Sequence, residues 1–147
     1  MGRNNDRQTY HLQPRPHNIP LTVKEIDTIL RAADELVGRG GRHLLTKILK
    51  GSKDKRVLQH DLDKNPCYGV WHDLPSQDVL AAIDRAIVDR FLSVVYSGQL
   101  PVLIYTDFGW ERERRLRIEE FLEEWTDWVT NGVTPASMEY LKDRDRQ

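Results

Sequence analysis

Residues 39–60 carry the densest positive charge in the chain. The segment has seven lysine and arginine residues and one acidic residue, Asp54, although the whole 147-residue chain has a net charge of -1. A phosphate group responds to the local density of charge rather than to the net sum. The segment is therefore a candidate phosphate-binding surface. A hydrated basic helix face would have the same composition, so that alternative stays open.

A Gly-Ser-Lys run, residues 51–53, lies in the middle of this segment. A glycine and a small hydroxyl residue at the start of a helix expose backbone N–H groups and a donor hydroxyl, and the helix dipole favours an anion there. We predict that Gly51, Ser52 and Lys53 bind phosphate, with a simple N-cap role for Ser52 as the alternative. The surrounding field would come from Arg42, Lys47, Lys50, Lys55 and Arg56.

A second group of chemically capable side chains lies in residues 60–72. It comprises His60, Asp61, Asp63, Cys67 and His72, together with the aromatic residues Tyr68 and Trp71. The spacing fits no zinc pattern, and a lone thiol needs a positioned base before it is catalytic. We expect no metal, no cofactor and no catalytic residue. The two aromatic side chains either contact DNA or close the core.

The composition predicts one globular domain with a polar surface. Hydrophobic residues make up 39% of the chain and charged residues 31%. No apolar run approaches the roughly 20 residues that span a bilayer, and the N-terminus lacks the apolar stretch of a secretory signal. One cysteine cannot form an internal disulfide. We expect a cytoplasmic protein without a membrane partner.

The periodicity of apolar residues predicts the elements that would position these groups. Residues 1–21 contain three prolines and no apolar period, which predicts a flexible arm. Spacings of three and four residues predict helices over 22–37 and 44–50, and a further one starting at Ser76 as its N-cap. A short helix could start near Ser52, before a loop over 59–75. On the helix from Ser76, the expected outward residues are Gln77, Ala81, Asp84 and Arg85.

Alternating residues then predict a β-hairpin. Leu92, Val94 and Tyr96 alternate with small polar residues, and 101–106 is a second β-rich run. The expected tip is Ser97, Gly98, Gln99 and Leu100. Helices followed by a two-stranded ribbon are the order of a winged helix, so we predict a mainly α fold with a hairpin wing over 22–110.

Residues 111–147 predict a C-terminal helical extension and a charged tail. Apolar residues form one stripe of a long helix that ends at Asn131-Gly132, followed by a short amphipathic piece. We expect the stripe to dock on the winged helix. Otherwise Phe121, Trp125 and Trp128 would form a homodimer or partner surface.

Residues 48–57, Ile-Leu-Lys-Gly-Ser-Lys-Asp-Lys-Arg-Val, resemble the signature of the RQC domain, the winged helix that follows the motor of RecQ-type DNA helicases. Tyr68-Gly69 matches the Tyr-Gly pair of that family. Asp73-Leu74 and the run 101–109 resemble its later landmarks in order. The resemblance covers roughly residues 22–110.

The resemblance implies a domain that grips duplex DNA near a single-strand junction, with phosphates held by the Gly-Ser-Lys region and by the starts of the following helices. The helix from Ser76 carries three aspartates against two arginines, so we expect only Ser76 and Gln77 to touch the DNA backbone. Recognition of shape or of a junction is therefore expected in place of base reading.

The implied role is non-enzymatic DNA binding in repair, replication or recombination, beside a separate helicase or other motor protein. The sequence has no Gly-x-x-x-x-Gly-Lys phosphate loop and no four-cysteine zinc module. In the family, a tip aromatic is implied to wedge strands apart. Here Tyr96 is the nearest aromatic and alternation allows it to pack inward. The alternatives are a dimeric winged-helix transcriptional regulator and a protein-interaction winged helix.

Overall fold

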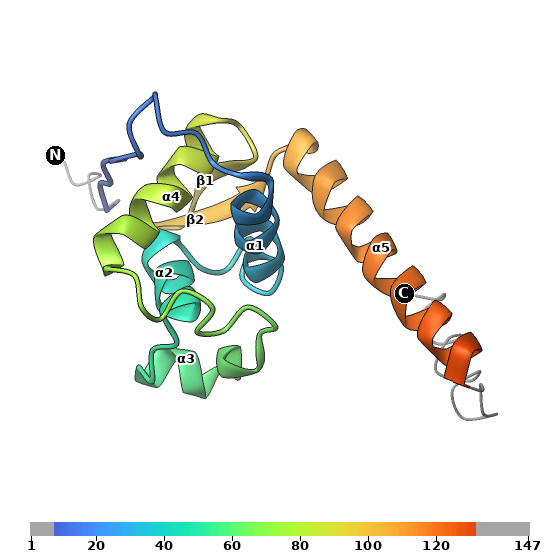
Figure 1. The fold of residues 1–147 in the computed structure, drawn as a ribbon. Coiled ribbons are helices and arrows are strands. Elements are labelled where there is room, and N and C mark those ends of the chain that lie inside the picture. The colour runs from blue at the N-terminus through green and yellow to red at the C-terminus, as the bar shows by residue number, and fades with distance from the viewer. Residues whose placement is uncertain (1–7, 132–147) are drawn as a thin grey trace, which may run out of the picture. The chain divides into compact units, whose positions relative to one another are not determined.

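The structure, a computed structural model, describes residues 8–131. The elements in chain order are α1 (Val23–Ala33), α2 (Arg42–Lys50), α3 (Lys55–Gln59), the 3-10 turn η2 (Leu62–Lys64), α4 (Ser76–Val88), β1 (Leu92–Ser97), β2 (Leu100–Tyr105) and α5 (Asp107–Asn131) (Figure 1). Helices followed by an antiparallel hairpin confirm the mainly α winged-helix fold. None of the described helices has the length and apolarity needed to cross a membrane.

The first two helices follow their sequence signals closely. α1 begins with a capping box, in which Thr22 and Glu25 satisfy each other's backbone N–H groups. It ends at Ala33, earlier than predicted, and turns continue the chain to Gly38. α2 ends where expected, because Gly51 adopts a left-handed conformation with φ of 74° and caps the helix.

The predicted N-cap Ser76 is wrong, and the alternative N-cap role of Ser52 is not found either. α3 is capped by the Asp54 side chain, which accepts a hydrogen bond from the Arg56 N–H, and Ser52 lies two residues before it. The N-cap residue of α4 is Pro75, so Ser76 is the first helical residue. Serine is a common N-cap residue, so the sequence around Ser52 and Ser76 correctly indicates that a helix starts nearby. The N-cap position itself is taken by Asp54 in α3 and by Pro75 in α4.

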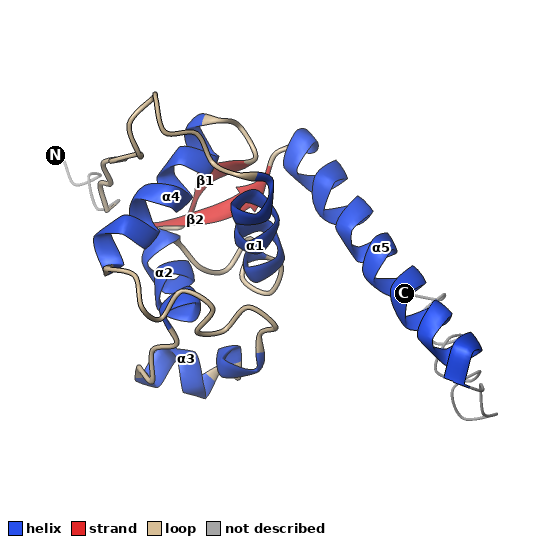
Figure 2. Cartoon of the chain, in the orientation of Figure 1, coloured by secondary structure: helices blue, strands red, loops and turns tan. Residues whose placement is uncertain are grey.

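The core lies between α1, α2, α4 and the hairpin. Its fully buried side chains include Ile29, Ile48, Ile83 and Leu103, contributed by these four elements. Figure 2 shows the two strands beside the helices that cover them. The strands pair with Ser97 opposite Leu100, so the turn has two residues, and Gly98 supplies its positive φ of 64°.

Residues 8–20, called the N-terminal strap below, have no helix or strand, as their prolines predict. In Figure 1 the strap runs past α4 on its way to α1. It is held there by backbone hydrogen bonds, from the Arg15 N–H to the Ala81 carbonyl (3.2 Å) and from the Gln8 N–H to the Gln99 carbonyl (2.8 Å). The sequence predicted a flexible arm because it has no apolar period there. The contacts that hold the strap involve residues far away in the sequence, which a local pattern does not show.

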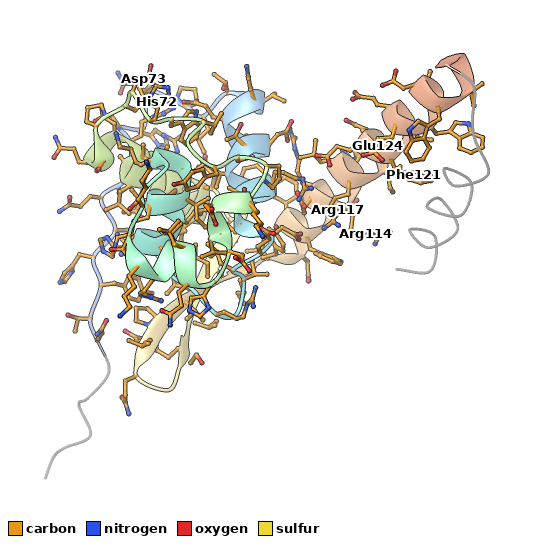
Figure 3. All side chains as sticks on the ribbon, turned by 90° about the horizontal axis from the view of Figure 1, so that it is seen from below. His72, Asp73, Arg114, Arg117, Phe121 and Glu124 are labelled. Atoms are coloured by element: carbon orange, nitrogen blue, oxygen red, sulfur yellow. The ribbon has the colours of Figure 1, made fainter. Side chains whose placement is uncertain are left out.

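The chain divides into two compact units, residues 1–113 and 114–147, and the predicted boundary after Trp110 falls inside α5. In the second unit, Figure 3 shows Arg114, Arg117, Phe121 and Glu124 along α5. The side chain of Trp125 is exposed, whereas Phe121 and Trp128 are half-buried. The amphipathic piece and tail predicted for 133–147 lie outside the described residues.

Candidate nucleic-acid interface

The Gly-Ser-Lys run and the Tyr-Gly pair are two sides of one close backbone contact. Gly51 and Gly69 both have φ of 74°, and both N–H groups donate to the Ile48 carbonyl, at 3.0 and 2.8 Å. A Cβ on Gly51 would lie 2.9 Å from the Gly69 Cα, closer than real side chains approach. Glycine is required here by both conformation and space. The two motifs therefore build the turn that presents Lys53.

Tyr68 locks this turn from the side. Its hydroxyl lies 2.9 Å from the Gly51 carbonyl and 2.8 Å from the Ser52 carbonyl, and donates to them. Tyr68 and Trp71 are both half-buried and pack against the core cluster. Of the two roles that the sequence left open, these contacts favour core closure.

Four of the seven basic residues of the segment are engaged within the domain, and Arg39 is one of them, because it donates to the Glu35 carbonyl. Arg42, predicted to supply surface charge, is buried and forms a bidentate pair with Asp84 at 2.6 and 2.9 Å. Lys47 pairs with Asp54 at 2.9 Å. Lys50 Nζ donates to the carbonyls of His72 (2.9 Å) and Leu74, in the loop whose residues His72 and Asp73 are labelled in Figure 3. These cations hold the fold together.

The exposed basic set consists of Lys53, Lys55 and Arg56. All three side chains are exposed, and none forms an ion pair within residues 8–131. The set lies on the turn after α2 and on α3, around the Gly51-Ser52 corner. It is the part of the predicted basic surface that the structure leaves available to an external anion.

The start of α3 already holds an anion, which alters the predicted phosphate site. The Asp54 carboxylate accepts from the Arg56 N–H at 2.9 Å, and the Ser52 hydroxyl oxygen accepts from the Asp54 N–H at 3.0 Å. The hydrogen bond from Lys47, followed by that from the Arg56 N–H, lowers the pKa of Asp54, so its carboxyl stays ionised. An incoming phosphate would therefore meet side-chain cations here and not a free helix terminus.

The outward face of α4 is covered by the strap, which corrects two sequence expectations. Asp84 and Arg85, expected to be exposed, have relative exposures of 0% and 7%. Asp84 accepts from the Gln13 N–H at 2.8 Å, and Arg85 donates to the Pro16 carbonyl at 3.0 Å. Ser76 and Gln77, in the first turn, remain exposed.

The aromatic residue nearest to the tip of the wing contacts the strap. The Tyr96 hydroxyl donates to the Gln8 carbonyl at 2.8 Å, and its ring lies 6.2 Å from that of Tyr10. Ser97, Gly98 and Gln99 are exposed at the tip. Leu100, half of whose surface is exposed, is the apolar residue nearest to the tip.

The histidine, cysteine and aspartate residues of 60–72 do not converge. Across residues 8–131 no group of three or more histidine, cysteine or acidic side chains could hold a metal ion. Cys67 is half-buried, packs against the core and forms no disulfide within residues 8–131.

Comparison with known protein families gives one match. The family model described as "RQC domain" matches residues 22–119, which include every helix and strand of the winged helix and the first half of α5. A search of curated proteins finds no match.

Proposed function

The chain belongs to the RQC domain family, whose winged helices are typically DNA-binding modules, and from that premise we propose that it binds duplex or branched DNA through phosphate contacts at the exposed basic set. The family match makes DNA the expected class of partner. The position of the cations around the Gly51-Ser52 corner supports this surface as the contact.

A single observation carries this proposal. Arg42, Lys47 and Lys50 are satisfied within the domain, whereas Lys53, Lys55 and Arg56 have no ion pair among the described residues. Exposed cations that form no ion pair remain available to phosphate and release counterions when they bind it. The same cations would contribute little to the stability of the domain.

The covered face of α4 supports recognition of DNA shape over DNA sequence. An ordinary winged helix inserts the helix before the hairpin into the major groove. Here the strap occupies the face of α4 around Ala81, Asp84 and Arg85, which leaves Ser76 and Gln77 to touch the backbone. Backbone contacts carry no direct sequence information.

We place this binding in DNA repair, replication or recombination. These 147 residues contain no phosphate loop of a motor ATPase, so any strand opening in this scheme is driven by a motor outside them. The contact of Tyr96 with the strap supports a wing that contacts DNA without separating its strands.

Fluorescence anisotropy tests the proposal. Duplex, forked and single-stranded oligonucleotides of unrelated sequence are titrated at several salt concentrations with the wild type and with Lys53→Gln/Lys55→Gln. The matched control is Lys24→Gln/Arg114→Gln, which removes two exposed cations from α1 and α5. Each lost phosphate contact reduces the salt slope by about one, so we expect the slope to fall by about two in the first variant and to stay unchanged in the control.

Each outcome of that titration has a definite meaning. Equal weakening of both double variants would contradict the assignment of the surface. No binding to any DNA at low salt would overturn the proposal and favour the protein-interaction alternative. Strong preference for one palindromic sequence by a stable dimer would favour the transcriptional regulator.

A further inference from the structure

A pocket of about 440 Å³ lies between the strap, the start of α2 and the wing. The strap contributes residues 8–11 and Gln13, and the wing contributes Val94 and residues 100–103. Its volume falls in the roughly 300–1,000 Å³ range of pockets that bury small ligands. The family match begins at residue 22, so one wall of this pocket is made by a segment outside the matched domain.

The charged residues of this pocket are all cationic. Arg39, Arg42 and Arg56 line it together with His11 and His43, and no aspartate or glutamate does. Arg42 is neutralised by Asp84. Arg39 donates to the Glu35 carbonyl, which leaves its charge in place, and Arg56 has no ion pair among the described residues. Two permanently charged guanidinium groups therefore remain without a carboxylate in a pocket that also holds His43.

The remaining walls offer an aromatic and apolar surface. Tyr10 lines the pocket, and the Arg42 guanidinium lies over its ring, 5.8 Å from the ring centre. Leu100 and Pro101 line the pocket from the wing. Cations beside this aromatic and apolar wall match the phosphate and the sugar and base of one nucleotide.

We propose that this pocket binds the terminal, phosphorylated nucleotide of a DNA strand, an inference that deepens the proposed function and rests on it. A terminal phosphate carries nearly two negative charges at neutral pH, whereas an internal phosphodiester carries one. Two unneutralised guanidinium groups fit the dianion better, because arginine binds phosphate through paired, charge-assisted hydrogen bonds. Arg56 belongs to both the exposed basic set and the pocket, so a strand bound along that set would reach the pocket at its end.

The test uses a DNA hairpin duplex with a single overhanging end. Three versions carry a 5′ phosphate, a 3′ phosphate or hydroxyl groups only, and each is titrated by anisotropy with the full chain. The variant Arg39→Gln/His43→Gln removes the Arg39 guanidinium and the His43 imidazole from the pocket and leaves Lys53 and Lys55 in place. Lys24→Gln/Lys64→Gln is the matched control at two exposed lysines that do not line the pocket.

We expect the wild type and the control to bind one phosphorylated end at least about tenfold tighter than the hydroxyl end, and the pocket variant to lose that preference. The hydroxyl-ended hairpin reports the proposed function by itself and should bind equally to all three proteins. Equal affinity of the wild type for all three ends would overturn the inference while leaving the proposed function standing. A preference that survives in the pocket variant would also overturn it.

A second measurement separates a strand end from a free nucleotide. Thymidine 5′-monophosphate is titrated into ¹⁵N-labelled full chain, and the amides of Gly40, Gly41 and His43 are followed by NMR. We expect these amides to shift with the phosphorylated hairpin and to need far higher concentrations of the free nucleotide. Equal affinity for the free nucleotide would overturn the assignment to DNA ends.

Discussion

The charged residues of α3 and of α4 differ in burial. On α4, Asp84 and Arg85 are buried beneath the strap and engaged by it. On α3, Lys55 and Arg56 are exposed and have no ion pair within residues 8–131. The side-chain types are similar, and the covering segment makes the difference. Charges beneath the strap hold the domain together, and charges outside it are available to a partner.

The largest expected loss of stability comes from removing the buried charge pair beneath the strap. Asp84→Ala leaves the buried Arg42 guanidinium without its carboxylate, which costs about 3–5 kcal/mol of unfolding free energy. Urea denaturation measures it. Asp78→Ala, on the exposed first turn of α4, is the control and should stay within about 0.5 kcal/mol of the wild type. Similar midpoints for the two variants would show that the pair contributes nothing.

The next effect breaks the turn on which α3 depends. Gly51→Ala forces a side chain into a left-handed conformation and against Gly69, so we expect a loss of about 2–4 kcal/mol and weaker DNA binding. Gly98→Ala has a similar φ and nothing within 4 Å of the new Cβ, so it should lose only about 1–2 kcal/mol. Chemical denaturation of both proteins measures the difference. Equal losses would mean that the close approach to Gly69 is unimportant.

A smaller effect tests the side-chain lock on the same turn. Tyr68→Phe removes the hydroxyl that donates to the Gly51 and Ser52 carbonyls, with an expected cost of about 1 kcal/mol. Tyr96→Phe, whose hydroxyl bonds to the strap at an exposed site, should cost less. Thermal unfolding of both variants provides the measurement, and a larger loss in Tyr96→Phe would contradict this ranking.

The smallest effect concerns the pair that fastens the strap to α1. Arg15 binds Glu25 through two hydrogen bonds of 2.8 Å, and this contact is the main cause that lowers the pKa of Glu25 to about 2. The unfolded chain binds this proton near pH 4.5, so the contribution is complete above that pH and disappears as pH falls towards 2. It should be at most about 1 kcal/mol because the pair is partly exposed. Glu25→Gln should show a shallower loss of stability over that range. The unfolding free energy of both proteins is measured by urea denaturation between about pH 5 and pH 2. An equal fall in the wild type and in Glu25→Gln would disprove the assignment.

The order of the elements was predictable because it follows from local pattern. The stripe of α2, the stop at Gly51 and the alternation in β1 each depend on neighbours within a few residues. The close contact of Gly51 with Gly69 was visible only as two motifs of a family signature. Their common role needs the spatial approach that the sequence does not encode locally.

The sequence by itself determined which residues carry the chemistry: the concentration of basic residues in 39–60, the glycine turn and the winged-helix order of elements. Tertiary structure alone decided which of those cations face solvent. Arg42 is neutralised by a carboxylate 42 positions away, and the face of α4 is covered by a strap whose contacts span 66 to 71 positions. The spacing of apolar residues identifies the polar face of a helix. Whether that face is buried depends on the distant segment that packs on it, which the spacing does not show.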